Sequence, residues 1–169
     1  MRVLRIAAIV FVFAGSGISG AGDAIASETV RFGGYQAGTI VVKTSERRLY
    51  LVLGHGEALR YPVGVGKPGK RWEGQTYIDG KHRNPAWAPP REVKRDNPNL
   101  PDVIPGGSPR NPMGVAALTL SGGEYAIHGT NVPSSIGGYV SYGCIRMFNQ
   151  DVADLFNRVS VGTPVIVTR

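Results

Sequence analysis

The sequence has a single cysteine, Cys144, and few aromatic residues, since Phe, Trp and Tyr together make up 8% of the chain. One cysteine cannot form an intramolecular disulfide, so a disulfide framework is excluded. The three histidines and the cysteine are scattered and match no short zinc-ligand pattern, so we expect no metal site. Leu and Glu are scarce, whereas Gly and Pro number 24 and 12. This composition favours strands and turns over helices.

Long hydrophobic runs are also missing, apart from one short run near the N-terminus. Arg2 and Arg5 flank its start, residues 6–14 are apolar, and Ala24-Ile25-Ala26 has the small-x-small pattern of a cleavage site. These features predict a secretory signal peptide that is cleaved after Ala26. The alternative is a membrane anchor, but the run is far shorter than the roughly 20 apolar residues that span a bilayer. We therefore expect a protein exported to the periplasm, without a stable membrane span.

Beyond the predicted signal peptide (residues 1–26), residues 27–169 are enough for one domain but not comfortably for two. No internal repeat or low-complexity linker divides them. The net charge of +7 for the whole chain suits an anionic partner such as cell-wall carboxylates or lipid headgroups. Nucleic acid is not expected as a partner, because the basic residues are scattered and an exported chain has little access to it.

Alternation of apolar residues and turn signals predicts a mainly β domain, a β-sandwich or partly open barrel, with one clear α-helix. The helix is predicted after the cysteine, over residues 149–159, with Asn149 as a plausible N-cap. Strands are predicted over residues 39–44, 47–53, 59–66, 114–120, 125–130, 138–141 and 164–168.

Residues 67–112 are dense in Pro, Gly and charge and contain Trp72 and Trp87. An irregular segment of this length is usually functional in a compact domain. We expect short strand pieces in it and a surface that covers or shapes a binding cleft. The alternative is that its tryptophans only pack against the sheet.

Three interpretations of Cys144 are open from the residues alone: a buried inert thiol, an intermolecular disulfide, or a reactive nucleophile. The thiol follows a predicted strand, and Tyr142-Gly143-Cys144 forms the turn before the predicted helix. Gly143 lets the backbone approach a substrate closely. A nearby helix N-terminus is expected to lower the pKa of the thiol. These are the requirements of an acyl-transfer nucleophile.

A thiol nucleophile also needs a base, for which the sequence offers three histidines. His55 lies at a hairpin tip and His82 in a charged loop, so both are most simply solvated. His128 ends an apolar strand, where a histidine is often a satisfied core residue. Because it ends a strand, as Cys144 also does, His128 is the best candidate for the base.

The stretch IHGTNVPSSIGGYVSYGCIRM, residues 127–147, resembles the signature of the YkuD-type L,D-transpeptidases. That signature reads HGT, about a dozen residues, then Ser-His-Gly-Cys, a hydrophobic residue and Arg. The segments VGVGKPG, NPAWAPP, NPNLP-x-VIPGG and NPMG also occur in similar order in periplasmic members. The resemblance covers nearly all of residues 27–169.

The resemblance implies roles for the matching positions. Cys144 would be the nucleophile, and His128 the base that activates it. The Gly129 carbonyl would orient the imidazole, in place of the aspartate of a serine-protease triad. The N–H groups of Gly143 and Cys144 would form the oxyanion hole.

Three further positions complete the implied site. Arg146 would neutralise a substrate carboxylate or brace the loop, and Ser141 would support the site by hydrogen bonding. Tyr142 departs from the family, which usually has His before Gly-Cys. It would contribute a hydroxyl and an aromatic face on the substrate side.

The resemblance implies a cysteine L,D-transpeptidase that acts on peptidoglycan tetrapeptide stems without a cofactor. It would form 3→3 cross-links or tether an envelope protein, such as an outer-membrane protein, to the wall. Two alternatives are kept. One is a peptidoglycan hydrolase or carboxypeptidase on the same scaffold, and the other is a non-catalytic wall-binding module with an inert cysteine.

Overall fold

The computed structural model describes residues 27–123 and 125–169, and the predicted signal peptide lies outside them. Two α-helices are present, α1 (Arg91–Asp96) and α2 (Asn149–Arg158), together with a 3-10 turn, η1 (Pro133–Ser135). The strands are β1 (Glu28–Arg31), β2 (Ile40–Lys43), β3 (Arg48–Gly54), β4 (Glu57–Pro62), β5 (Val65–Gly66), β6 (Gly74–Arg83), β7 (Ala116–Leu120), β8 (Ala126–His128), β9 (Tyr139–Ser141), β10 (Ile145–Arg146) and β11 (Pro164–Thr168). The prediction of a mainly β fold is confirmed.

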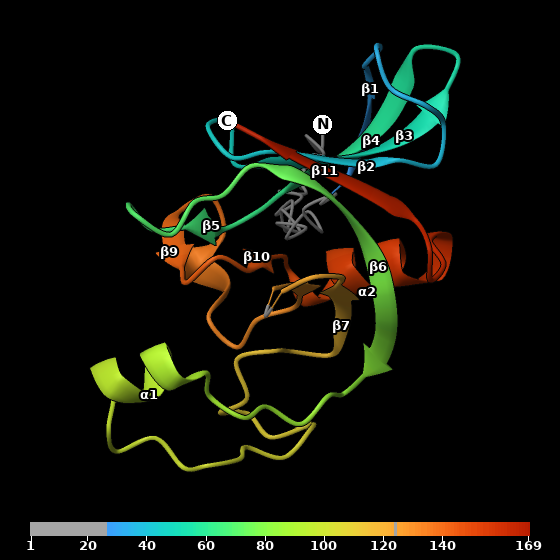
Figure 1. Cartoon of the computed structure of the whole chain (residues 1–169). Coiled ribbons are helices and arrows are strands. Elements are labelled where there is room, and N and C mark those ends of the chain that lie inside the picture. The colour runs from blue at the N-terminus through green and yellow to red at the C-terminus, as the bar shows by residue number, and fades with distance from the viewer. Residues whose placement is uncertain (1–26, 124) are drawn as a thin grey trace, which may run out of the picture.

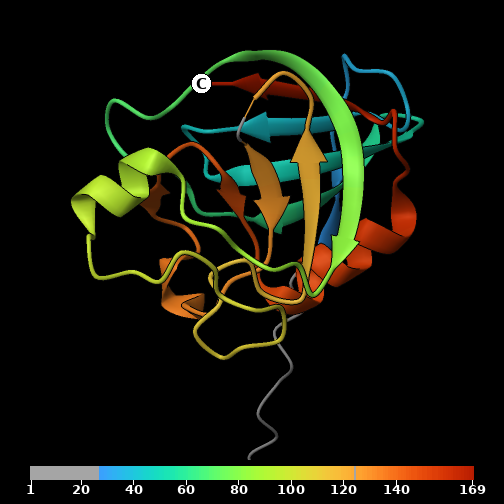
Figure 2. The same ribbon diagram turned by 60° about the horizontal axis from the view of Figure 1, so that its bottom comes forward.

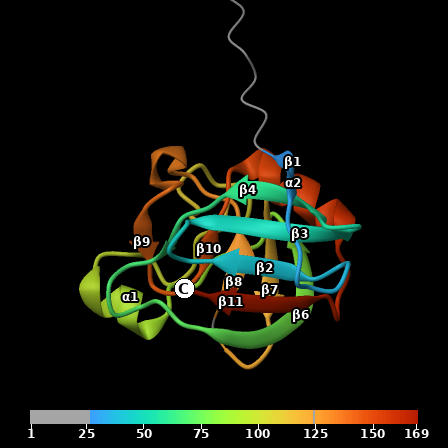
Figure 3. The same ribbon diagram turned by 90° about the horizontal axis from the view of Figure 1, so that it is seen from above.

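Nine strands form one sheet in the order β1-β4-β3-β2-β11-β6-β7-β8-β10, and β5 pairs with β9 in a second. Figure 3 shows β4, β3, β2, β11 and β6 side by side. The first half of β6 pairs with β11 and the second half with β7, with a register shift between Ile78 and Gly80. The long strand β6 thus bends from the layer that contains β11 into the layer that contains β7 (Figure 1). The sheet curls into a partly open barrel. The barrel does not close, because β1 and β10 remain unpaired with each other at the two edges of the sheet.

Alternating apolar side chains of the strands fill the space between the layers, where they meet one face of α2. Residues at i, i+3 and i+4 of this helix, Val152, Leu155 and Phe156, are buried in the same cluster as Ile40 and Leu118. This spacing is that of an amphipathic helix, as the sequence predicted. The core therefore fixes α2 and the inner strands in one rigid body.

Asn149 does not cap α2 as predicted. Phe148 is the N-cap residue and makes no side-chain capping bond. The Asn149 Oδ1 instead accepts hydrogen bonds from the backbone N–H groups of Thr130 (3.0 Å) and Val115 (3.4 Å). The side chain ties the start of the helix to the loop that follows β8, because tertiary N–H groups outside the helix compete for the same oxygen.

The segment 67–112 differs from its prediction of short strand pieces, since it contains the ten-residue strand β6 and the helix α1. Residues 85–112, here called the α1 arm, then fold back on themselves. Trp87 and Ile104 exchange backbone hydrogen bonds of 2.9 and 2.8 Å, and Asn111 donates to the Pro85 carbonyl at 2.8 Å. In Figures 1 and 2 the arm loops away from both layers, with α1 at its outer end. No helix of the described residues is both long and apolar enough to cross a bilayer.

Candidate active site

Five of the seven residues to which the family resemblance assigns a role in the site line one pocket. Its lining includes Ser141, Tyr142, Cys144 and Arg146 from the β9–β10 segment and His128 from the end of β8. The remaining lining residues are Lys70, Trp87, Pro90, Glu92, Val93, Pro112, Met113 and Tyr125. The α1 arm therefore does contribute to the wall of the pocket, as its composition predicted.

Pairing of two short strands brings the histidine and the cysteine segment together. β10 lies parallel to β8, with Ile145 opposite Ile127 and Arg146 opposite His128. The N–H of Met147 donates to the His128 carbonyl at 2.8 Å. Cys144 directly precedes β10, so this register holds the thiol at the same end of the sheet as the imidazole.

His128 is 4% exposed, and its Nδ1 lies 2.7 Å from the Gly129 carbonyl oxygen. Burial, and secondly the charge of Arg146, lowers the pKa of His128 to about 4, although the Gly129 and Pro112 carbonyls oppose the shift. A carbonyl oxygen can only accept, so Nδ1 carries the proton and the Nε2 lone pair is left as the basic atom. The imidazole is neutral near pH 7 and has the tautomer of a general base.

The thiol of Cys144 is not activated in the way the sequence suggested. Burial raises its pKa, and a backbone hydrogen bond from Ala126 and the charge of Arg146 only partly offset this. Along the chain, β10 stands between the turn and the first residue of α2. A protonated thiol beside a neutral imidazole requires transfer of its proton to a base during attack.

The turn that carries Cys144 is held by side chains on both sides. The Ser141 hydroxyl donates to the Cys144 carbonyl at 2.6 Å and accepts the Gly143 N–H at 3.1 Å. Trp72 donates its Nε1–H to the Gly143 carbonyl at 2.9 Å, and its indole stacks on Tyr125 at 5.1 Å between ring centroids. Ser141 thus joins both ends of the turn by hydrogen bonds. No local pattern marks Trp72 and Tyr125 as a pair, because they are far apart along the chain.

Gly143 is required for a steric reason that supports a first prediction. Its φ is +129°, and a Cβ at this position would lie 2.2 Å from Cε1 of Tyr125. Gly143→Ala is expected to displace the Tyr125 ring and to cost about 1–3 kcal/mol of unfolding free energy. Thermal unfolding would be measured beside Gly137→Ala, where φ is +85° but nothing lies within 4 Å. Equal effects at the two glycines would contradict a clash.

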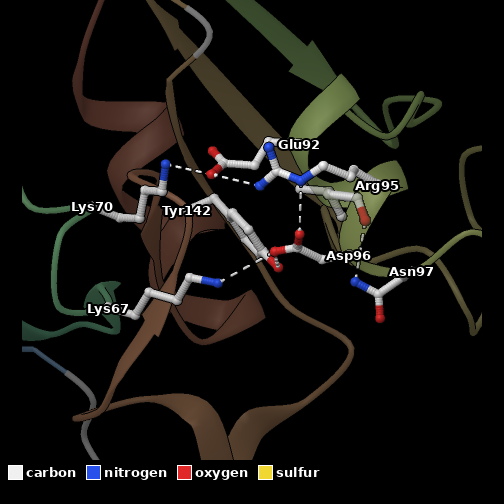
Figure 4. A network of polar contacts seen from close by, with 8 residues as sticks. Lys67, Lys70, Glu92, Arg95, Asp96, Asn97 and Tyr142 are labelled. Carbon is white, nitrogen blue, oxygen red and sulfur yellow. Dashed lines mark hydrogen bonds and ion pairs between the residues drawn. The ribbon is translucent and has the colours of Figure 1, made fainter.

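Tyr142 lines the pocket and also reaches the α1 arm. Its hydroxyl donates to Oδ2 of Asp96 at 2.7 Å, and the Lys67 ammonium lies 3.6 Å from the centroid of its ring. Figure 4 shows the tyrosine between the two partners. At this position the side chain links the turn that carries Cys144 to α1.

The other histidines lie elsewhere. His55 is exposed at the β3–β4 turn with φ +52°, and His82 is exposed on β6. Within residues 27–123 and 125–169, no three His, Cys, Asp or Glu side chains gather as metal ligands would. Of the three histidines, His128 is the one placed on the pocket with Cys144.

Comparison with known proteins assigns the family. A family model described as the L,D-transpeptidase catalytic domain, YkuD, matches residues 37–167. The chain therefore belongs to the YkuD family of L,D-transpeptidase catalytic domains. The structure of the L,D-transpeptidase from Mycobacterium smegmatis, 20% identical, superposes with a TM-score of 0.62 over 78% of this chain and 58% of that one, which shows the shared fold.

Curated relatives agree with this assignment. The chain is 41% identical over 135 residues to the probable L,D-transpeptidase YbiS of Escherichia coli K12, covering 75% of this chain and 43% of that protein. It is 40% identical over 150 residues to the probable L,D-transpeptidase ErfK/SrfK of Salmonella typhimurium, covering 83% and 45%. The chain thus spans less than half the length of these relatives. A Brucella melitensis structure named as a probable carnitine operon oxidoreductase is 40% identical, with a TM-score of 0.56 over 84% of this chain and 92% of that one.

Proposed function

We propose that the protein is a cysteine L,D-transpeptidase that acts on the tetrapeptide stems of peptidoglycan. The observation that carries the proposal is the shared pocket of His128 and Cys144, in which the Gly129 carbonyl fixes a neutral imidazole. This arrangement supplies a nucleophile, a base and an orienting group, which acyl transfer requires. Its residues are the positions at which the chain matches the family signature.

In the proposed reaction, Sγ of Cys144 attacks the carbonyl of the third stem residue, expected to be meso-diaminopimelate. The thiol proton passes to Nε2 of His128 and then to the nitrogen of the leaving D-Ala as its C–N bond breaks. The stem remains on the enzyme as a thioester. An amine nitrogen then attacks this carbonyl, the C–S bond breaks, and the sulfur regains a proton as the thiol.

Two groups would stabilise charge in this reaction. Arg146 lines the pocket, and its guanidinium is proposed to bind a substrate carboxylate. The N–H groups of Gly143 and Cys144 are proposed as the oxyanion hole. Because the Gly143 N–H donates to Ser141 Oγ, that bond would have to yield or be shared when the oxyanion forms.

We also propose where the reaction takes place. Residues 1–26 would direct export to the periplasm, and residues 27–169 would form a single catalytic domain. The acceptor would be the diaminopimelate side chain of another stem, which gives 3→3 cross-links, or an amine of an envelope protein. Comparing muropeptides from cells with and without the gene would show which products depend on the protein.

Purified protein incubated with a tetrapeptide stem and a tripeptide acceptor tests the reaction itself. Mass spectrometry of the products is expected to show a cross-linked peptide and released D-Ala. Tripeptide alone, with no cross-linked product, would instead identify a hydrolase on the same scaffold. An unchanged stem that nevertheless binds would identify a non-catalytic wall-binding module.

A second prediction concerns Tyr142, which contacts Asp96 and lies on the pocket. Since the pKa of tyrosine is ordinarily about 10, its hydroxyl is not suited to replace His128 as the base. Tyr142→Phe is expected to retain most thioester formation, measured without amine, and Tyr142→His to be active with a changed acceptor preference. If Tyr142→Phe stopped thioester formation as completely as His128→Ala, the hydroxyl would belong to the nucleophile machinery.

A further inference from the structure

The α1 arm is fastened to the rest of the pocket by polar side chains. None of the residues of α1 is buried. Glu92 pairs with Lys70 at 2.5 Å, and Asp96 with Lys67 at 3.8 Å, in addition to the hydrogen bond from Tyr142. Figure 4 shows both carboxylates directed from α1 toward the lysines of the β5–β6 loop. The arm is therefore positioned over the pocket by charge and hydrogen bonding, without an apolar anchor in α1.

Among the described residues that line the pocket, Glu92 supplies the one carboxylate. The other charged side chains of the lining, Lys70 and Arg146, are cationic. Lys70 is the main cause of the lowered pKa of Glu92, so the carboxylate is ionised near neutral pH. The pocket thus has one carboxylate, which α1 supplies. Its other charged side chains are cationic and suit an anionic acyl donor.

We infer that Glu92 binds the ammonium group of the acyl acceptor, in exchange for the ammonium of Lys70. The inference rests on the proposed transpeptidase function. Both side chains of the pair are about one-third exposed, at 34% and 32%, and such an ion pair contributes little free energy. An incoming ammonium can therefore replace Lys70 at low cost while the carboxylate stays paired.

In this role, Glu92 positions the ammonium group of the acceptor in the pocket and so helps to determine which acceptors bind. The acceptor binds as R–NH3⁺, loses one proton to solvent, and attacks the thioester carbonyl as the free amine. The C–S bond breaks, the thiolate takes the second proton from nitrogen, and the products are an amide and the Cys144 thiol. Glu92 takes no part in bond making. Asp96, held by Tyr142 and Lys67, keeps α1 in place for this binding.

The test separates the acceptor from the donor. Acyl-enzyme is formed first with a tetrapeptide stem, then offered either a tripeptide ending in meso-diaminopimelate or hydroxylamine, which is a neutral nucleophile at pH 7. Glu92→Gln is expected to raise KM for the tripeptide about tenfold, the equivalent of about 1.4 kcal/mol. Thioester formation and the reaction with hydroxylamine are expected to stay unchanged.

Two variants control for a purely structural role. Lys70→Met breaks the same ion pair but leaves the carboxylate, so it should not raise KM for the tripeptide. Asp102→Asn removes an exposed arm carboxylate that pairs with Lys94, away from the pocket, and should have no effect. Equal increases in Glu92→Gln and Lys70→Met, or a matching loss with hydroxylamine, would overturn the inference. A wild-type protein that forms no thioester would refute the proposed function, and the inference with it.

Discussion

Cys144→Ala is expected to abolish thioester formation and acyl transfer while the fold survives. In the proposed reaction the sulfur forms the covalent bond, and removing one member of a catalytic unit removes most of the acceleration that the unit provides. We expect a loss of roughly 10⁴-fold or more in the rate of D-Ala release. The side chain is partly exposed at the pocket and the substitution is small, so thermal unfolding should change little.

Unfolding and turnover would be measured on the same preparation of the variant. Activity that persists in a folded Cys144→Ala protein would mean that another group forms the covalent bond, or that none is formed. If Cys144→Ala lost both its fold and its activity, Cys144→Ser, which keeps a side chain of similar size, would separate the two effects. A folded serine variant that has lost activity would support the nucleophile assignment.

His128→Gln is expected to lower the rate of thioester formation by about 10²-fold or more, the usual contribution of a positioned general base. The loss follows because burial raises the pKa of the Cys144 thiol, so the thiol cannot ionise unaided near neutral pH. Glutamine keeps the approximate volume and a polar end but has no basic nitrogen. His55→Gln and His82→Gln, at exposed positions, serve as matched controls and should retain activity.

The pH dependence of thioester formation by the wild type also tests whether His128 is the base. The pKa of His128 is lowered to about 4, so its basic form is present above that pH and lost as the pH falls through it. The acid limb of kcat/KM for thioester formation is therefore expected near pH 4, well below the usual pKa of histidine. Equal losses in all three histidine variants, or an acid limb near pH 6.5, would contradict the role given to His128.

The sequence predicts several strands and the main helix because these depend on local patterns. Apolar alternation identified β2, β3 and β7 within one or two residues, and the i, i+3, i+4 spacing identified α2. Cys144 is singled out as the one cysteine of the sequence, and His128 as the histidine that ends an apolar strand. These features need only neighbouring residues to be recognised.

The features that the sequence did not predict depend on contacts between distant segments. Trp72 reaches the Gly143 carbonyl across the fold, and no local pattern marks such a pair. Asn149 was read as a helix cap, but tertiary N–H groups occupy its oxygen. The expectation of a lowered Cys144 pKa is wrong for a related reason, since burial of the thiol by the surrounding fold raises that pKa.

The most direct test of the central claim is intact-protein mass spectrometry of the wild type mixed with a tetrapeptide stem in the absence of an amine acceptor. We expect a mass increase equal to the stem without its D-Ala, located by peptide mapping on the segment that contains Cys144, and absent in Cys144→Ala. A protein whose mass does not change while D-Ala is released, or an adduct that persists in Cys144→Ala, would contradict a thioester at this residue.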